Sequence, residues 1–424
     1  MSSSTLERLF SKQSVIEAWK SFYSEARSQQ SSGVDGITVQ DFEKNKTVYL
    51  NRLCADIRDT YRFTALKPAF VSKPNGKWRV ICIPTVQDRI VQRILCRYLA
   101  ELPRLRINNE VSFGFIKGRG ASAARDRAVK LRNSFPWAYK SDISSFFDNV
   151  RRAELTENLS KALRVRSLDL LLADAIGCEC KEADSRTARI LASCGIKKGI
   201  GIRQGMPLSP VLANFVLREF DEEMTRLGFK MVRYADDFIV LCSTEVECRA
   251  AHEHATSILS AIGLSLPELG RSESKTSIAD PFCPVEFLGL ELRRKRSDDY
   301  SLVITSTQIE KIRNRINDYS NVDFLLKQKI TFFQIIQRVQ DMAIGYKSAY
   351  ACASNFDEIE KFLADAPYAV VRALFRHSFG PDALDKLRVR QREFFGMEPS
   401  RNSATPRKAK QKGARGRYPV ISGY

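Results

Sequence analysis

The sequence predicts a mixed α/β fold, with short strands in the middle of the chain and helices at both ends. Apolar residues in the first 60 positions recur at spacings of three and four, the period of a helix. Several short runs between residues 67 and 305 are rich in strand-forming residues and are separated by turn signals. Beyond about residue 306 the helical spacing returns. The chain therefore begins with a helical segment, continues with a segment of strands and helices, and ends with another helical segment.

Size and charge limit the classes of function. The chain has 424 residues, enough for two or three structural units. Lys and Arg number 68 against 49 Asp and Glu, which leaves a formal net charge of +19. Such an excess favours a polyanionic partner, nucleic acid before membrane, because no amphipathic or lipidation signal accompanies it. A merely soluble basic protein is the alternative.

Cysteine usage and the N-terminus predict a soluble intracellular protein. The ten cysteines lie mostly alone, often within apolar runs, and form no C-x-x-C pair. Cys178, Cys180 and Cys194 have no neighbouring histidine and match no common zinc spacing. Buried reduced thiols are therefore expected. The N-terminal segment lacks the pattern of a signal peptide, and no run of about 18 apolar residues occurs.

A β-hairpin and a helix are expected after the N-terminal helices. Gly33 and Gly36 mark a tight loop. Within residues 67–84, Pro74-Asn75-Gly76 is a turn signal between two strand-forming runs, which predicts a β-hairpin. Residues 86–101 carry helical periodicity.

The middle of the chain alternates between strands and helices. We expect a strand over residues 138–143 and helices over 152–176. Ser209-Pro210 opens a long helix, because proline is tolerated in the first turn. Residues 231–242, MVRYADDFIVLC, form two short strand-forming runs around Ala235-Asp236-Asp237, as at the tip of a hairpin.

The C-terminal part is expected to be mainly helical and to end in a basic tail. Residues 285–292 and 301–305 predict further strands, and helices are expected over 329–350 and 357–378. Residues 401–416 are rich in Lys and Arg and have no apolar period. Such a tail is disordered when free and serves either as a solvating appendage or as a nucleic-acid arm.

Two adjacent acids in the apolar run at 231–242 raise the question of what compensates their charge. A carboxylate removed from water without a partner costs several kcal/mol or takes up a proton. Arg233 alone cannot neutralise both Asp236 and Asp237. A bound metal ion is therefore the favoured partner.

A second strand with an acid strengthens the metal hypothesis. Asp142 lies in KSDISSFFDNV, in a strand-like context. Mg²⁺ prefers octahedral oxygen coordination from one or two carboxylates and substrate phosphates. Two neighbouring strands would hold two ions about 3.5 to 4 Å apart, a clamp for in-line displacement at phosphorus. An Asp-Asp pair alone is more often a turn or a solvated loop end, so the inference depends on both motifs together.

Seven segments in a fixed order carry a resemblance to a known family. The chain resembles the reverse transcriptases, most closely the bacterial branch that includes group II intron enzymes and stand-alone, defence-associated relatives. The similarity covers roughly residues 30–295 and continues weakly to IGYKSAYA at 344–351. The segments are GVDGITVQDF, SKPNGKWRVICIPTVQDRIVQRIL, FGFIKGRGA, KSDISSFFDNV, GIRQGMPLSPVLANFVLREFD, RYADDFIVLC and VEFLGLEL.

The resemblance implies a right-hand polymerase, an α/β fold of fingers and palm with a helical thumb. The expected boundaries are an N-terminal helical extension over 1–60, fingers and palm over 61–295, a helical thumb over 296–395, and a basic flexible tail over 396–424.

The resemblance also implies the residues that hold the metal ions. Asp142, Asp236 and Asp237 would be the catalytic acids, and together with the carbonyl of Ile143 they would bind two Mg²⁺ ions. Asp237 would be the partner of Asp236 in the pair. Lys275 matches a position where the family often has a lysine able to protonate pyrophosphate, although a surface lysine is the commoner case.

Five further residues are implied to bind the nucleotide. Lys73 and Arg79 would hold the incoming triphosphate, for which a planar guanidinium is well suited. Phe147 matches the aromatic residue that excludes a ribose 2′-hydroxyl; a core aromatic is the alternative. Gln204 and Gly205 would line the nucleotide pocket, where glycine lets the template backbone approach closely.

The function implied is RNA-directed DNA synthesis in the bacterial cytoplasm. The enzyme would copy a dedicated structured non-coding RNA, encoded near its own gene, into cDNA from dNTPs and act in defence against phages. The sequence contains no N-A-x-x-H or V-T-G motif, no H-N-H nuclease pattern and no Cas1-like segment, which favours the stand-alone group. A free-standing group II intron maturase and a non-catalytic RNA-binding protein are the alternatives.

Overall fold

The computed structural model describes residues 4–27, 29–58, 60–72, 76, 78–270 and 274–398. It divides into two compact units, Met1–Asp280 and Pro281–Tyr424. The fold is mixed α/β, as the sequence predicts. Lys73, the turn Pro74-Asn75, and the tail at 401–416 lie outside the described residues, so the predictions made for them stay predictions. The division into fingers, palm, thumb and tail also stays a prediction.

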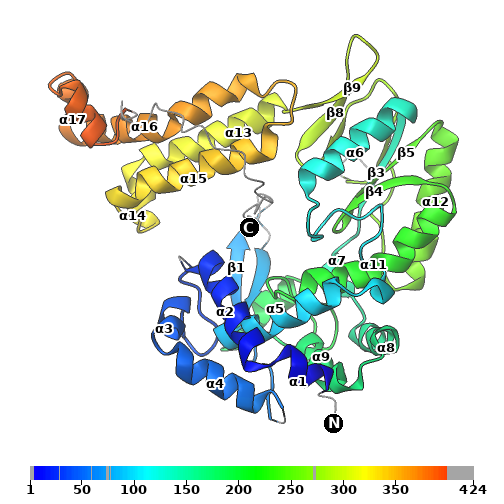
Figure 1. Cartoon of the computed structure of the whole chain (residues 1–424). Coiled ribbons are helices and arrows are strands. Elements are labelled where there is room, and N and C mark those ends of the chain that lie inside the picture. The colour runs from blue at the N-terminus through cyan, green and yellow to red at the C-terminus, as the bar shows by residue number, and fades with distance from the viewer. Residues whose placement is uncertain are drawn as a thin grey trace, which may run out of the picture. The chain divides into compact units, whose positions relative to one another are not determined.

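Four helices make up the start of the first unit, which confirms the helical character predicted for the first 60 residues (Figure 1). Side chains of Ser4, Ser11 and Thr38 cap three of them by accepting hydrogen bonds from backbone N–H groups. Gly33 is required by close packing, because a Cβ there would lie 2.6 Å from the Cα of Thr85. The helices are α1 (Thr5–Leu9), α2 (Lys12–Ala26), α3 (Val39–Lys44) and α4 (Lys46–Asp56).

The predicted hairpin and the helix after it are both present. Strands β1 (Lys67–Ser72) and β2 (Trp78–Ile83) pair antiparallel, from Lys67 opposite Ile83 to Ser72 opposite Trp78. Helix α5 (Val86–Ala100) begins after Thr85, whose side chain accepts a hydrogen bond from the Asp88 N–H. It packs against α2 and α11 (Ser209–Arg226).

A four-stranded antiparallel sheet forms the centre of the first unit, in the order β4-β5-β3-β6. Helix α6 packs against β4 and β5, and α12 packs against β3 and β5 (Figure 1). Tyr139 and Phe238 of the sheet and Phe220 of α11 are fully buried. The sequence analysis did not predict α6, α12 or β6. The elements are β3 (Trp137–Asp142), β4 (Lys230–Tyr234), β5 (Asp237–Cys242), β6 (Ser277–Ala279), α6 (Ala121–Ser134) and α12 (Glu245–Ala261).

Short helices connect the strands of this sheet. The helical region predicted over 152–176 is confirmed by α8, η2 and α9, and the helix predicted to open at Ser209-Pro210 is α11. The elements between β3 and α11 are α7 (Phe146–Asn149), α8 (Arg152–Leu163), η2 (Arg166–Leu168), α9 (Asp169–Gly177) and α10 (Ser185–Ser193), and η1 (Pro103–Leu105) lies before β3.

The second unit contains a small antiparallel sheet and a set of helices, as predicted for residues beyond 285. Helix α15 packs along α16, and α13 packs against α16. The elements are β7 (Val285–Phe287), β8 (Leu290–Arg294), β9 (Tyr300–Val303), α13 (Ser306–Asn317), η3 (Asp318–Ser320), α14 (Val322–Lys327), α15 (Phe332–Tyr350), α16 (Asp357–Phe379), η4 (Pro381–Leu384) and α17 (Val389–Phe394).

All ten cysteines are free thiols, and most are buried or half-buried as expected. Cys283 and Cys352 are exposed, so the expectation of burial is wrong for these two. In the described part of the chain, none of the helices has both the length and the apolar character needed to cross a membrane.

Candidate functional site

Strand pairing brings the three predicted acids together. Strands β3 and β5 are antiparallel and place Asp142 directly opposite Asp237. Residues directly opposite each other in adjacent strands project from the same face of a sheet. Strands β4 and β5 are joined by a two-residue turn, Ala235-Asp236, in which Ala235 has a left-handed φ of 58°. The Ile143 N–H donates to the Asp236 carbonyl at 3.0 Å, so the end of β3 is tied to this turn.

Two lysines, rather than Arg233, supply positive charge to these acids. Strand β6 pairs with β3 so that Ser277 lies opposite Lys140, and this register carries Lys275 to the end of β3, where its ammonium pairs with Asp142 Oδ2. The Nζ atom of Lys140 lies 4.0 Å from Asp237 Oδ1. Lys140 is two residues before Asp142 on the same strand face, a period-two signal that the sequence analysis missed.

Burial disfavours the ionised form of two of the acids. Burial, with the charge of Asp142 as a smaller cause, raises the pKa of Asp236 above its usual value. Burial also raises the pKa of Asp237 to about 6, with Lys140 opposing and Asp236 adding to the rise. Within the described residues, the buried Oδ1 of Asp237 accepts no hydrogen bond. A carboxylate oxygen left without a donor is suited to bind a cation.

The same acids form no complete ligand set by themselves. Among the described residues, no group of three or more Asp, Glu, His or Cys side chains is arranged to hold a metal ion. Because Lys275 is bonded to Asp142, that carboxylate is engaged by an ammonium group. A divalent cation placed here would have to displace Lys275 from Asp142.

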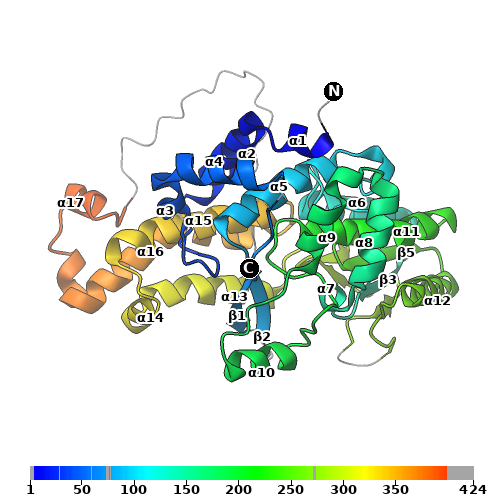
Figure 2. The same ribbon diagram turned by 90° about the horizontal axis from the view of Figure 1, so that it is seen from below.

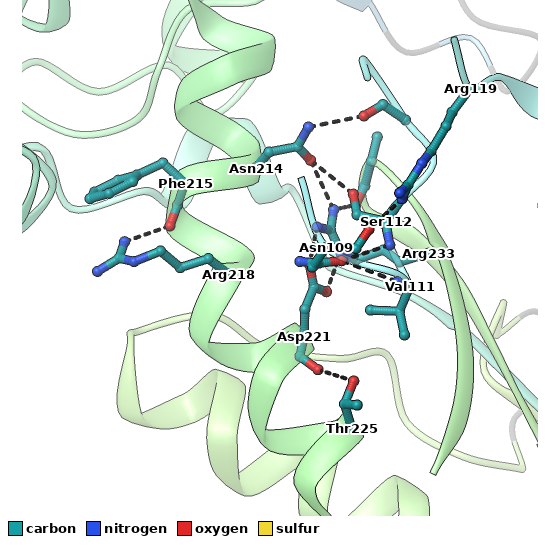
Figure 3. A network of polar contacts seen from close by, with 12 residues as sticks. Asn109, Val111, Ser112, Arg119, Asn214, Phe215, Arg218, Asp221, Thr225 and Arg233 are labelled. Atoms are coloured by element: carbon teal, nitrogen blue, oxygen red, sulfur yellow. Dashed lines mark hydrogen bonds and ion pairs between the residues drawn. The ribbon is translucent and has the colours of Figure 1, made fainter. Parts of the chain in front are cut away.

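A buried polar network supports the turn that carries Asp236. The fully buried guanidinium of Arg233 pairs with the equally buried Asp221 on α11. Its Nη1 donates to the carbonyl of Ala235 at 2.9 Å and to Asn214 Oδ1 at 3.2 Å. Figure 3 shows the side chains of Asn214 and Asp221 directed from α11 toward Arg233. Arg233 is therefore committed to the support of the turn.

The segment 109–119 completes this network from the other side. Asn109 Nδ2 donates to Asp221 Oδ2 at 2.7 Å (Figure 3). The backbone N–H of Phe113 donates to the Arg233 carbonyl at 2.8 Å. Gly114 lies against the turn so closely that a Cβ would be 2.5 Å from the Ala235 nitrogen. The sequence analysis quoted FGFIKGRGA only as part of the resemblance and missed this supporting role.

Three of the predicted nucleotide-binding residues, Arg79, Gln204 and Gly205, lie on strand β2 or against it. Lys73 lies outside the described residues, and Arg79 is half-buried on β2. The charge of Arg79 acts on Asp236, where it opposes part of the rise in pKa caused by burial. The Gln204 carbonyl accepts from the Cys82 N–H at 2.7 Å. Gly205 has a φ of 100°, and a Cβ there would lie 2.8 Å from the Cys82 carbonyl oxygen, so the close approach requiring glycine is to β2 itself.

The loop over residues 199–205 contacts both strand β2 and Phe147. The carbonyl of Phe147 accepts from the Ile202 N–H at 2.7 Å. Phe147 is half-buried on α7 and packs at the edge of the core, whereas its neighbour Phe146 is 1% exposed and belongs to the core. The ring of Phe147 thus retains an exposed surface, as a steric barrier requires.

An acidic residue missed in the sequence holds the loop in place. Glu179 Oε2 accepts from Arg203 Nη2 at 2.6 Å, and its Oε1 accepts from Arg152 Nη1 at 2.7 Å and the Gly199 N–H at 2.8 Å. Burial would raise the pKa of Glu179, but these donors and charges hold it below its usual value. Arg203 directly precedes Gln204, so Glu179 positions the predicted pocket residues indirectly.

Comparisons with known proteins agree on one family. A family model described as "Reverse transcriptase (RNA-dependent DNA polymerase)" matches residues 71–292, more than half of the chain. Protein YkfC of Escherichia coli (strain K12) is 27% identical over 338 residues, which cover 68% of this chain and 83% of YkfC.

Two further relatives are matched over shorter segments. The group II intron-encoded protein LtrA of Lactococcus lactis subsp. cremoris is 24% identical over 225 residues, which cover 52% of this chain and 35% of LtrA. The Retron Ec73 reverse transcriptase of Escherichia coli is 24% identical over 182 residues, which cover 40% of this chain and 51% of that enzyme. The chain thus spans most of YkfC but less than two thirds of the other two.

Proposed function

Because the chain belongs to the reverse transcriptase (RNA-dependent DNA polymerase) family, we propose that it copies one dedicated structured RNA into cDNA with two Mg²⁺ ions, and that this synthesis protects bacteria from phages. RNA-directed DNA polymerisation is the activity of the family. The ions, the template and the defence role are the parts that are proposed. The bacterial cytoplasm is the proposed place of synthesis.

The pairing of Asp142 with Asp237, beside Asp236 on its turn, is the observation that carries the catalytic proposal. The three carboxylates and the carbonyl of Ile143 would hold the ions, consistent with the unbonded Oδ1 of Asp237. When bound, Mg²⁺ ions activate the 3′-hydroxyl and neutralise charge on the leaving pyrophosphate. The turn is rigidly supported, which suits a site that must place acids accurately.

Lys275 has a proposed role that follows from its present partner. Its ammonium pairs with Asp142, and that hydrogen bond raises the pKa of Lys275. Lys275 would move from Asp142 to the pyrophosphate when the metal ions bind, because Asp142 is then compensated by the ions. There the ammonium is positioned to donate a proton to the leaving group.

The nucleotide pocket is proposed to be lined jointly by β2 and the loop through 199–205, which pack against each other. Lys73 and Arg79 would bind the triphosphate, and Gln204 and Gly205 would line the pocket. The half-buried ring of Phe147 would exclude a ribose 2′-hydroxyl and so favour dNTPs.

The proposal of an RNA template encoded near the gene rests on charge and family. A net charge of +19 favours a polyanion, and RNA is recognised mainly through its shape, loops and single-stranded ends. The defence role is supported by the likeness of the motif series to stand-alone bacterial reverse transcriptases.

A maturase function is the second candidate, because LtrA, a group II intron-encoded protein, matches over 225 residues. The test is to express the gene with its flanking DNA, challenge the cells with a panel of phages, and sequence the RNA and cDNA that copurify. We expect protection that requires Asp142 and Asp236, and cDNA that maps mainly to the flanking RNA. Copurification of a self-splicing intron would favour the maturase instead. Absence of primer extension by the purified protein would favour a non-catalytic RNA-binding function.

A further inference from the structure

A cavity in the N-terminal helices lies apart from the acids of the central sheet. It is lined by residues of α2, α3 and α4, which pack on one another and stand together in both views (Figures 1 and 2). Its volume is about 390 Å³. This size is at the lower end of the range of small-molecule sites, about 300 to 1,000 Å³.

The floor of the cavity is apolar and aromatic. Ile16, Trp19 and Leu50 line it from α2 and α4. The indole of Trp19 is fixed, because its Nε1 donates to Glu43 Oε2 at 2.8 Å and its ring packs on Phe42 with centroids 4.5 Å apart. Tyr23 is half-buried beside it, so one aromatic ring remains accessible from the cavity.

The rim of the cavity is positively charged. Lys12, Lys20, Arg27 and Lys46 surround it against a single acid, Glu43. Glu43 is already bonded to Lys46 and to the Trp19 indole. Among the residues that the structure describes, Lys12, Lys20 and Arg27 form no ion pair. An anionic group at the rim would therefore meet cations that have no competing partner.

Helical spacing explains how the sequence builds this surface. Positions 12, 16, 20 and 23 follow one another at intervals of three or four, so Lys12, Ile16, Lys20 and Tyr23 share one face of α2, and Arg27 at the C-cap continues the spacing. The residues of α4 that line the cavity also recur at helical spacing. They are Lys46, Thr47, Leu50, Asn51 and Cys54.

We propose that this cavity binds single-stranded RNA, with one base against Tyr23 and the apolar floor and the flanking phosphates on the basic rim. An aromatic floor inside a ring of cations matches a nucleotide unit, which joins a planar base to an anionic phosphate. The site would hold a single-stranded part of the RNA away from the acids. This inference rests on the RNA-templated activity of the family and does not depend on the defence role.

An acidic peptide would pair with the cations of the rim, but it would leave the accessible aromatic ring and the apolar floor without a planar partner. Base stacking on an aromatic side chain strengthens binding by an amount on the order of tenfold, and it tolerates any base. RNA therefore accounts for both the charge and the floor of the cavity.

Cross-linking tests whether single-stranded RNA binds at this cavity. The full-length protein is mixed with a 12-nucleotide single-stranded RNA that contains 4-thiouridine, irradiated, and digested for mass spectrometry. We expect cross-linked peptides from α2 and α4, including Tyr23. The Asp236→Asn variant should give the same cross-links, since its change lies outside the cavity. Cross-links confined to other segments would overturn the proposal.

Two variants test the chemistry of the cavity. The double charge reversal Lys20→Glu/Arg27→Glu should weaken RNA binding and reduce the slope of log K against log salt by about 1.4, or about 0.7 for each lost contact. The matched control Arg127→Glu/Lys130→Glu changes the same charge on the exposed face of α6 and should leave the cavity cross-links in place.

The second variant, Asn51→Trp, fills the cavity from an exposed position without changing charge. Wild-type protein should bind a uridine 12-mer on the order of tenfold more tightly than an abasic 12-mer. Asn51→Trp should reduce this difference but keep the salt slope. Both cavity variants should still extend a short primer on an added template, which separates this proposal from the polymerase assignment. Unchanged RNA affinity in both variants, or affinity for an acidic peptide alone, would overturn it.

Discussion

Arg233 and Asp221 form a two-point ion pair from which solvent is excluded, and the same guanidinium holds the turn that carries Asp236 (Figure 3). Nε and Nη2 of Arg233 donate to the two oxygens of Asp221 at 2.6 and 2.5 Å. A buried charge that loses its partner is destabilising, because it can neither be rehydrated nor find a replacement. The pair therefore couples the stability of the central sheet to the position of Asp236.

Removing the acid of this pair should destabilise the protein strongly. We expect Asp221→Ala to lower the free energy of unfolding by about 3 to 5 kcal/mol, because Arg233 would remain buried without its partner. Urea unfolding measures the change. The control is Glu223→Ala on the same helix, which breaks a solvent-exposed pair with Arg226 and should have little effect on stability. Equal effects of the two substitutions would contradict the assigned role of the buried pair.

Asp236→Asn should abolish DNA synthesis but leave folding and RNA binding intact. The substitution is nearly isosteric and removes one negative charge from a site proposed to gather two divalent ions. Primer extension with Mg²⁺, thermal melting and RNA binding are measured together. Asp126→Asn, on the exposed face of α6, is the control and should retain activity. Synthesis near the wild-type rate by Asp236→Asn would show that the metal assignment is wrong.

Phe147→Val should relax the selection between deoxyribonucleotides and ribonucleotides. The smaller side chain leaves room for a 2′-hydroxyl, so ribonucleotide use relative to deoxynucleotide use should rise by about 10- to 200-fold. Single-nucleotide extension measures the ratio. Phe146→Leu is the matched control, because Phe146 is buried and its loss should lower stability without changing sugar selection. If both variants keep the wild-type ratio, Phe147 is a core aromatic only.

The stability supplied by Glu179 should depend on pH. Its pKa is held below its usual value in the folded protein, so its contribution is present above the unfolded pKa of about 4.5 and is lost as the pH falls through the folded pKa. Glu179→Gln should therefore destabilise the protein at pH 7 by about 1 to 2 kcal/mol, since the side chain is 31% exposed and partly screened. The difference from wild type should vanish at acidic pH.

Thermal melting across the pH range checks this expectation. Glu157→Gln breaks an exposed pair with Lys161 and serves as the control, with little effect at either pH. A Glu179→Gln protein that is as stable as wild type at pH 7 would show that the two arginines do not depend on this acid.

The sequence by itself was sufficient to locate β3, β4 and β5 and the three acids at their ends. The hairpin around Ala235 and Asp236 follows from two apolar runs with an acidic turn between them, and the strand ending at Asp142 follows from its own short pattern. The helices at both ends follow from a period that apolar residues repeat over several turns. Such signals are local, so they can be recognised without knowledge of the fold.

Only the tertiary structure decided which groups compensate the acids. Lys275 reaches Asp142 across 133 residues because β6 pairs with β3 in one register, and the three-residue β6 has no periodic signal of its own. Arg233 lies three residues from Asp236 in the sequence but pairs with Asp221 beneath the turn. Strand register and burial depend on how distant segments pack. The local spacing of residues therefore does not show which cation pairs with which acid.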